Sequence, residues 1–572
     1  MAKAINKLNA LQTSGDAPSW MTEESYKTLC GGYLLNDETP KEMYLRVAQS
    51  VAGYLGKPDM AHKFFDAMWN NWLCPSTPVL CNSGTDRGLP VSCFSSYTED
   101  STLHIMETLT EVAMMSKYGG GTAVHMSAVR PKGSAISRGG KTDGVVPFAK
   151  IFDSVAVGIS QGGVRRGSTA VYLDIEHDDF DEFINIRRPQ GDANRQCLNL
   201  HHGVTISDSF MEKVVSGDAE ARRRWKELIK TRFETGEPYV VFIDNVNNNN
   251  PAMYADHNLS VKGSNLCSEI FLHTDDKHSL VCCLSSLNLA RWDEWKDTDV
   301  VETSIWFLDG VMSEFLDKAK KLPGFERAIN FAEKSRALGL GILGLHSLFQ
   351  RKGLAFDDLQ AYLLNGLIFK TIDERTLKAS QDLAKEFGEP EWCKGHGVRN
   401  SHRTALAPTV SNSLIASNVS PGIEPWAANG FSQKSAKGTF IRKNPELVGL
   451  LESLKKNDDE TWKTIVLNEG SVQHLDFLDE QQKKVFLTAR EINQFIIVKL
   501  AGQRQKFIDQ GQSLNIFFPS NADTKYINQV HIEAWKSGCK SLYYMRTSSV
   551  LKGDTGSREY KRDISECSYC EG

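Results

Sequence analysis

The chain has 572 residues, 66 basic and 71 acidic side chains, and a formal net charge of −5. This balance disfavours a nucleic-acid-coating surface. No stretch reaches the ~18 uninterrupted apolar residues of a membrane helix, and the first residues lack the apolar core of a secretory signal. The length exceeds one usual hydrophobic core. We therefore expect a cytoplasmic protein, with several domains or one large α/β domain, that binds neither nucleic acid nor membrane.

The first 75 residues predict a helical region. Thr39, Pro40 and Glu42 make a good helix start, with an N-cap, a proline in the first turn and a glutamate at the capping-box position. Apolar residues then recur at every fourth position, which predicts one buried stripe. The stripe consists of Met43, Val47, Val51 and Leu55.

From about Cys74 the chain changes to short apolar runs separated by glycine-rich turns and amphipathic helices. Four of these runs predict strands that are buried on both faces, because they are continuous rather than alternating. Such runs alternating with helices indicate βα units and a mostly parallel sheet or barrel. The four runs are 170–175, 239–243, 338–343 and 514–518, and the polar run 247–250 predicts a surface turn.

The last residues, 547–572, have almost nothing to bury, which predicts a mobile tail. It ends in a C-x-x-C pair, Cys567 and Cys570. Such a pair can form a small disulfide ring and exchange it with another dithiol. Half of a zinc site and an incidental pair remain open alternatives, although zinc needs four ligands. The stretch from Met545 to Cys567 has an r.m.s. span of roughly 25 Å, so the pair could carry electrons to a buried site.

Inside the chain, the segment 264–270 places Asn265, Cys267 and Glu269 two residues apart. If this segment is extended, the three side chains face the same way. One face would then hold an amide, a thiol and a carboxylate. Taken alone, a buried cysteine flanked by polar loop residues is the plainer interpretation.

This segment resembles the radical-bearing finger loop of ribonucleotide reductase large subunits, and other segments match that family in the same chain order. Cys93 resembles the first cysteine of the family's substrate-reducing pair. Cys282 resembles the second, because the residues that follow favour it over Cys283. The pair Tyr543 and Tyr544 resembles the stacked tyrosines that relay the radical in class I members.

The same resemblance assigns substrate-binding positions. Residues 408–413, followed by 420–425, are similar to the loop that binds the substrate diphosphate, and hydroxyl and backbone N–H groups can donate to phosphate oxygens. A Ser/Thr-rich loop without this context would be a plain turn. The positions implied are Pro408, Thr409, Ser411 and Ser413, together with Thr77 and Ser92.

Effector control is implied as well. The glycine-rich run 161–167 resembles the family's specificity loop, in which Gln161 and Arg165 match contact positions for a bound deoxynucleotide or ATP effector. Asp100 and Arg130 match further effector-binding positions. The match begins near Tyr33, so we expect control of specificity without the N-terminal ATP cone that switches overall activity in many members.

The fold that the resemblance implies is a ten-stranded α/β barrel, made of two five-stranded parallel halves with the Cys267 loop through its centre. We expect three parts. They are a helical N-terminal region at 1–75, the barrel at 76–546 and a flexible redox tail at 547–572. A homodimer is a further expectation of the family.

The implied reaction reduces ribonucleoside diphosphates to 2′-deoxyribonucleoside diphosphates for DNA synthesis. A thiyl radical on Cys267 abstracts the 3′ hydrogen, and Glu269 takes the 3′-OH proton. Cys93 and Cys282 supply two electrons and become a disulfide, which requires Cα atoms within about 7 Å. Asn265 holds the substrate. The terminal dithiol then reduces this disulfide, and thioredoxin or glutaredoxin reduces the dithiol.

Protein side chains do not generate such a radical unaided. The pair Tyr543 and Tyr544 favours class I, in which a separate metal-containing small subunit makes the radical. We therefore expect neither a cofactor nor a metal in this chain. Three alternatives stay open. They are an adenosylcobalamin-dependent class II enzyme, a nucleotide-binding regulatory protein with a degenerate reductase fold, and a zinc-binding scaffold.

Overall fold

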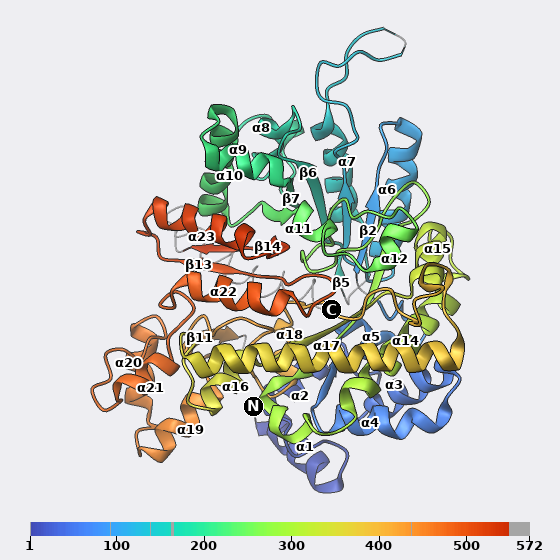
Figure 1. The fold of residues 1–572 in the computed structure, drawn as a ribbon. Helices are drawn as coiled ribbons and strands as arrows, with labels where there is room; N and C mark the ends of the chain where they lie inside the picture. Colours follow the sequence, from blue (N-terminus) through green and yellow to red (C-terminus); the bar gives the residue numbers. More distant parts are fainter. Residues whose placement is uncertain (1, 92, 138, 162–164, 436–437, 548–572) are drawn as a thin grey trace.

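The structure is a computed structural model that describes residues 2–91, 93–137, 139–161, 165–435 and 438–547. The side chains of 2–5, 160–161, 165–166, 432–435 and 438–441 lie outside this description. The architecture is α/β, with a strand ring surrounded by helices (Figure 1). None of the described helices is both long and apolar enough to cross a membrane.

The N-terminal region is helical, as predicted. Thr39 caps α3 through a complete capping box with Glu42, and Pro40 occupies the first turn. All four residues of the predicted stripe are buried. The stripe packs on α14, where Gly310 permits close approach, because a Cβ there would lie 2.7 Å from the Val51 side chain. The helices are α1 (Ala2–Ser14), α2 (Glu23–Cys30), α3 (Pro40–Leu55) and α4 (Ala61–Trp69), and α14 spans Val300–Ala319.

Five strands form the first half of the ring, and each pairs with its neighbour in parallel. In spatial order they are β2 (Cys93–Tyr97), β3 (Thr122–His125), β6 (Thr169–Asp174), β7 (Leu200–Ile206) and β8 (Tyr239–Phe242). The predicted runs at 170–175 and 239–243 are β6 and β8, which are fully buried apart from Asp174. The surrounding helices α6 (Thr102–Lys117), α7 (Val145–Gly158), α9 (Asp208–Ser216) and α10 (Ala219–Thr235) lie around these strands in the upper part of Figure 1.

The second half runs antiparallel to the first. It begins with β9 (Leu280–Asn288) and β10 (Leu338–Leu343), which pair in parallel. Single parallel bridges continue it, from Leu340 to Thr404 and from Leu406 to Gln512. The last parallel pair is β13 (Ile516–Phe518) with β15 (Met545–Thr547). The predicted runs at 338–343 and 514–518 are therefore strands, the latter starting two residues later.

Antiparallel pairing joins the halves at both seams. At one seam β2 pairs with β9, and at the other β14 (Ser541–Leu542) pairs with β8. Residues 541–547 run from β14 into β15, so this one segment touches both halves. The expected ring of two five-stranded parallel halves is thus confirmed. The short strand β1 (Leu73–Pro75) adds to β9 outside the ring.

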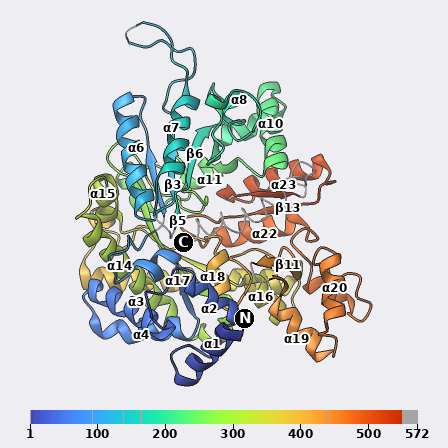
Figure 2. The same cartoon turned by 180° about the vertical axis from the view of Figure 1, so that it is seen from behind.

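The other elements surround the ring. The long helix α17 lies beside α14 and α22, while α19, α20 and α21 gather at one edge in both views (Figures 1 and 2) around a small core of their own. The remaining helices are α5 (Thr77–Asn82), α8 (Phe180–Phe183), α11 (Ile243–Asn247), α12 (Ala252–Asp256), α13 (Trp292–Trp295), α15 (Glu326–Ser335), α16 (Leu345–Arg351), α17 (Leu359–Phe387), α18 (Val410–Ile415), α19 (Pro445–Ser453), α20 (Asp459–Leu467), α21 (Glu480–Val485), α22 (Gln494–Gln505) and α23 (Thr524–Lys536). Two hairpins complete the set, β4 (Ser160–Gln161) with β5 (Arg165–Arg166) and β11 (Gly430–Ser435) with β12 (Gly438–Lys443).

The polar run 247–250 follows α11 as the turn that was predicted, with Asn247 as the last helical residue. The three-part division at 75 and 546 stays a prediction.

Candidate active site

The segment 264–270 is a compact turn, which the side chain of Asn265 holds together. Its Oδ1 accepts hydrogen bonds from the backbone N–H groups of Glu269 and Ile270, both at 3.1 Å. Its Nδ2 donates to Glu269 Oε1 at 3.0 Å. Ser268 has a φ of 65°, a left-handed conformation that reverses the chain. The extended backbone considered for this segment is therefore wrong, and the turn itself brings the amide and the carboxylate together.

Both halves of the ring hold this turn, hereafter the finger loop (264–270). The backbone carbonyls of Asn265, Cys267 and Ser268 each accept a hydrogen bond from a hydroxyl group. Because these donors come from opposite sides of the ring, the loop is fixed between the halves. The donors are Tyr172 of β6, Ser513, and Ser541 of β14, at 2.7, 2.6 and 2.7 Å.

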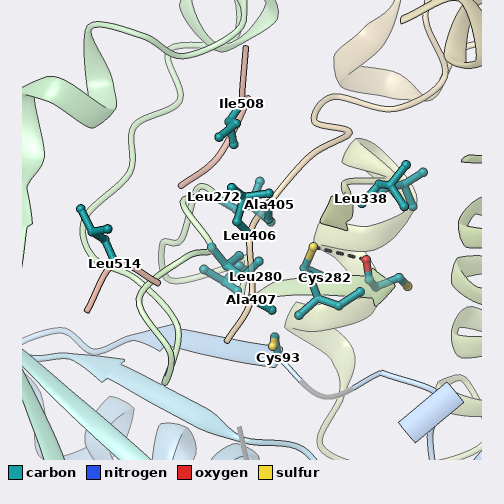
Figure 3. Close-up of a cluster of buried hydrophobic side chains, with 14 of the residues drawn as sticks. Cys93, Leu272, Leu280, Cys282, Leu338, Ala405, Leu406, Ala407, Ile508 and Leu514 are labelled. Atoms are coloured by element: carbon teal, nitrogen blue, oxygen red, sulfur yellow. Dashed lines mark hydrogen bonds between the residues drawn. The ribbon is translucent and has the colours of Figure 1, made fainter. Parts of the chain in front are cut away.

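Two cysteines face each other beside the finger loop. The register of β2 and β9 pairs Cys93 directly with Cys282, and such antiparallel partners have Cα atoms about 4.5–5.5 Å apart. That separation is within the reach of a disulfide. Asn265 Nδ2 lies 3.4 Å from Cys93 Sγ. Figure 3 shows both sulfurs among buried apolar side chains, such as those of Leu280 and Ala407.

The neighbouring Cys283 lies on the other side of β9, because successive side chains on a strand alternate between faces. The thiol of Cys283 lies near the ion pair of Arg336 and Asp309, and Cys93 is also within electrostatic reach of it. Gln510 Nε2, in contrast, lies 3.6 Å from Cys282 Sγ. The structure thus places Cys282, and not Cys283, opposite Cys93.

Burial shifts the pKa values of Glu269 and Cys282 upward, toward the protonated, neutral form. It raises the pKa of Glu269 to about 7, although hydrogen bonds from Asn265 and Ser513 favour the carboxylate. Burial also raises the pKa of the Cys282 thiol well above its usual value. At neutral pH the site therefore combines a neutral thiol with a carboxyl group that can readily take or release a proton.

Three tyrosines form one cluster beside the finger loop. The rings of Tyr543 and Tyr544 have centroids 4.3 Å apart. The ring of Tyr239 lies 4.7 Å from Tyr543 and 5.2 Å from Tyr544, and its hydroxyl donates to the Tyr544 hydroxyl at 3.0 Å. Tyr543 and Cys267 belong to the same buried apolar cluster. Aromatic rings thus connect the interior thiol with Tyr544, which is only partly buried.

Tyr239 was missed as a site residue, because the sequence identifies it only as the first residue of a strand. The β8–β14 register brings it to the tyrosine pair, by pairing Val240 with Leu542 and Val241 with Ser541. Nothing local in the sequence indicates this contact across 304 positions. Ser513 and Gln510 were missed for the same reason.

A charged network lies behind Tyr544. Its hydroxyl is 3.4 Å from His201 Nδ1, and that nitrogen is 2.8 Å from Glu237 Oε1. Burial alone would raise the pKa of Glu237, but Arg187 and the histidine hold it well below its usual value. The guanidinium of Arg546 lies 4.3 Å from the Tyr544 ring centre. Fixed charges therefore surround the outermost tyrosine.

Most of the predicted substrate-binding residues lie at one place. Thr409 has a φ of 44° just before α18, and its hydroxyl accepts a hydrogen bond from Gly422 N–H at 2.7 Å. Ser413 donates to the Thr409 carbonyl. Asn412 ties α18 to the end of β1, two residues before α5, by donating to Pro75 O at 3.1 Å. Thr77 starts α5, Pro408 and Ser411 flank Thr409, and Ser92 lies outside the described residues.

Of the predicted effector residues, two are in contact. Arg130 and Asp100 form a salt bridge at 2.5 Å on a partly exposed surface. Gln161 and Arg165 are cross-strand partners in the hairpin of β4 and β5, but their side chains lie outside the description. Cys567 and Cys570 also lie outside the described residues.

Comparison with known proteins gives one consistent result. A family model described as the ribonucleotide reductase barrel domain matches residues 91–220, 216–395 and 390–545. A second, the ribonucleotide reductase all-alpha domain, matches residues 20–88. Together they cover nearly all of the described chain.

Individual proteins agree with the family models. The chain is 40% identical to a putative ribonucleoside-diphosphate reductase large subunit of Frog virus 3, over 93% of this chain and 95% of that one. It is 34% identical to the ribonucleoside-diphosphate reductase large subunit of Invertebrate iridescent virus 3, over 94% and 96%. A solved structure of the class Id ribonucleotide reductase alpha subunit of Actinobacillus ureae superposes with a TM-score of 0.87 at 44% identity, covering 94% of this chain and 99% of that one.

Proposed function

This chain belongs to the ribonucleotide reductase large-subunit family, and from that premise we propose that it reduces ribonucleoside diphosphates to 2′-deoxyribonucleoside diphosphates. One observation carries the proposal. The finger loop brings the Asn265 amide into contact with both the Glu269 carboxylate and the Cys93 sulfur, and Cys93 faces Cys282 across two strands. An amide, a base and a dithiol beside Cys267 are the groups that the reaction needs.

In the proposed reaction, each of these groups carries a defined proton, hydrogen atom or electron. A Cys267 thiyl radical takes the 3′ hydrogen atom, and Glu269 takes the 3′-OH proton, a role that a pKa of about 7 supports. The 2′-OH leaves as water with a proton from Cys93. Cys93 and Cys282 together give two electrons and two protons and form a disulfide. The second proton and one electron go to C2′, and the other electron and the proton held by Glu269 go to the 3′ carbonyl group. Cys267 then returns the hydrogen atom to C3′, so its radical is regenerated.

We propose that the radical comes from a separate metal-containing small subunit, and that none of the residues described here holds the generating cofactor. The contact between the tilted rings of Tyr543 and Tyr544, beside the cluster that contains Tyr543 and Cys267, supports a relay from outside. The similarity to a class Id alpha subunit also favours class I over an adenosylcobalamin enzyme.

We also propose binding sites for the substrate and the effector, a reductant and an oligomeric state, which agree with these residue roles. Residues 408–413 with Thr77 bind the substrate diphosphate, while Asp100, Arg130, Gln161 and Arg165 bind a deoxynucleotide or ATP effector. Cys567 and Cys570 reduce the interior disulfide and are themselves reduced by thioredoxin or glutaredoxin. The active form is a homodimer in the cytoplasm.

Turnover by the purified chain tests the class. The chain is incubated with a ribonucleoside diphosphate and a dithiol, with and without its small subunit, and deoxynucleotide is measured. We expect product only with the small subunit. Product with adenosylcobalamin alone would contradict the assignment to class I, and a parallel assay with the triphosphate tests the substrate.

A further inference from the structure

Three potential metal ligands converge at the base of the finger loop. His273 Nε2 lies 3.0 Å from one carboxylate oxygen of Asp275, and His278 Nδ1 lies 2.8 Å from the other. Within the described residues, these three form a group whose ligand atoms all lie within 4.8 Å of one another. Both imidazoles are buried, whereas 30% of the Asp275 side chain is exposed. Two imidazoles and a carboxylate suit a divalent transition metal, zinc above all.

The other ring nitrogen of His273 faces the backbone of Ser260. Nδ1 lies 2.8 Å from the Ser260 carbonyl oxygen and 3.2 Å from the Ser260 N–H. Depending on the tautomer, Nδ1 can donate to the first or accept from the second. When Nδ1 donates to the carbonyl, Nε2 is free to bind a cation that Asp275 also binds.

The surroundings resemble the outer shell of a metal site. Histidine ligands commonly donate their second ring N–H to a backbone carbonyl, and His273 Nδ1 is placed to do so to Ser260. Apolar groups usually enclose such sites. Trp392 packs on both rings, with centroids 5.9 Å from His273 and 5.1 Å from His278. Asp275, the one member that reaches solvent, leaves a route for the ion and a position for water.

We propose that His273, Asp275 and His278 bind one divalent transition-metal ion, with zinc as the best match. Ser260 precedes the finger loop, and residues 273–278 lead from it into β9, so the ion braces the two limbs of the loop that carries Cys267. Water takes the fourth tetrahedral position, and the bracing is independent of the proposed reaction. This differs from the expectation, drawn from the sequence, that the chain holds no metal.

The test uses the full chain with Cys567→Ser and Cys570→Ser, because the terminal thiols could compete for zinc. After treatment with a chelator, the protein is titrated with Zn²⁺ and with Co²⁺. We expect one equivalent of either metal, and a cobalt spectrum without the intense sulfur-to-metal bands of thiolate ligands. Asp275→Asn and His278→Gln should each weaken cobalt binding at least tenfold.

His396→Gln is the matched control, because His396 pairs with Asp256 at 2.9 Å but belongs to no group of three ligands among the described residues. It should bind cobalt like the parent. Zinc should also raise the Tm of the parent and of this control, because an ion that binds only the folded protein stabilises it. It should not raise the Tm of Asp275→Asn, which lacks the intact site. Circular dichroism checks that each variant is folded. Failure of the parent to bind an equivalent, or unchanged uptake in folded Asp275→Asn and His278→Gln variants, would overturn the proposal.

Discussion

At the scale of the residue, Glu269 has the most finely balanced environment in the site. Its carboxyl is fully buried, which disfavours the charge, while Asn265, Ser513 and its own backbone N–H favour it. The first effect is larger, so the pKa rises to about 7. A general base is most effective when its pKa lies near the working pH, because it can then both accept and release a proton readily.

Glu269→Gln should therefore abolish turnover without harming the fold. We expect a loss of about 10²–10⁴-fold in kcat, the usual contribution of a general base. In the parent enzyme, kcat should rise with pH through about 7 as the carboxyl ionises. A variant that keeps more than a tenth of the parent's kcat would exclude Glu269 as the base.

The stability of the same variant has a defined pH dependence. Because the folded-state pKa is raised, folding favours the protonated carboxyl, and the ionised form costs stability. This cost is absent below about pH 4.5 and complete above about pH 7. The Tm of Glu269→Gln relative to the parent should therefore increase across this window, as calorimetry can measure. A difference that falls with rising pH would contradict the assigned environment.

Tyr239 is a positioning residue for Tyr544, to whose hydroxyl it donates a hydrogen bond. Tyr239→Phe keeps the ring packing but removes this bond, which is worth about 1 kcal/mol. We expect kcat with the small subunit to fall about tenfold or less, with little change in KM. Tyr526→Phe, whose hydroxyl accepts from Gln494 N–H elsewhere, is the control. Equal kcat in the two variants would show that Tyr239 does not act on the relay.

At the scale of the element, the finger loop depends on the close approach of another backbone. Gly511 N–H donates to the Glu269 carbonyl at 2.8 Å. A Cβ at position 511 would lie 2.3 Å from the Phe271 ring, so only glycine allows this contact without displacement. The position of the base is thus set by a residue 242 positions away.

Gly511→Ala should displace the loop. We expect a destabilisation of about 1–3 kcal/mol, as for overpacking in a core, seen as a lower Tm, together with a lower kcat. Gly449→Ala is the control, since a Cβ there meets nothing within 4 Å in α19, and alanine favours a helix. Similar Tm values for the two variants would argue against the contact at Gly511.

Local features could be predicted from the sequence, and contacts between distant segments could not. The capping box at Thr39 and the buried strands β6, β8 and β10 follow from patterns within a few residues. The position of the finger loop could not be predicted, because it depends on hydroxyl groups of Tyr172, Ser513 and Ser541, which lie far away in the sequence. The ring architecture and the site residues came from the family resemblance, not from periodicity.

At the scale of the whole molecule, the two seams of the ring are where the proposed chemistry is located. At one seam, β2 and β9 place Cys93 opposite Cys282. At the other, residues 541–547 join β8 to β13 and carry the tyrosine pair between β14 and β15. The finger loop lies between them and is bonded to both sides. Closure of the ring therefore brings together Cys93 and Cys282, the proposed radical thiol Cys267 and the proposed tyrosine relay.

The central claim is that Cys267 carries the radical chemistry, and Cys267→Ser tests it most directly. Cys197→Ser serves as the control, because Cys197 is buried and its charged neighbours are Asp153, Lys150 and Arg195 rather than residues of the site. Both variants and the parent are assayed with small subunit, effector, dithiol and ribonucleoside diphosphate. We predict deoxynucleotide from the parent and from Cys197→Ser, and none from folded Cys267→Ser. Undiminished product from Cys267→Ser would contradict the account.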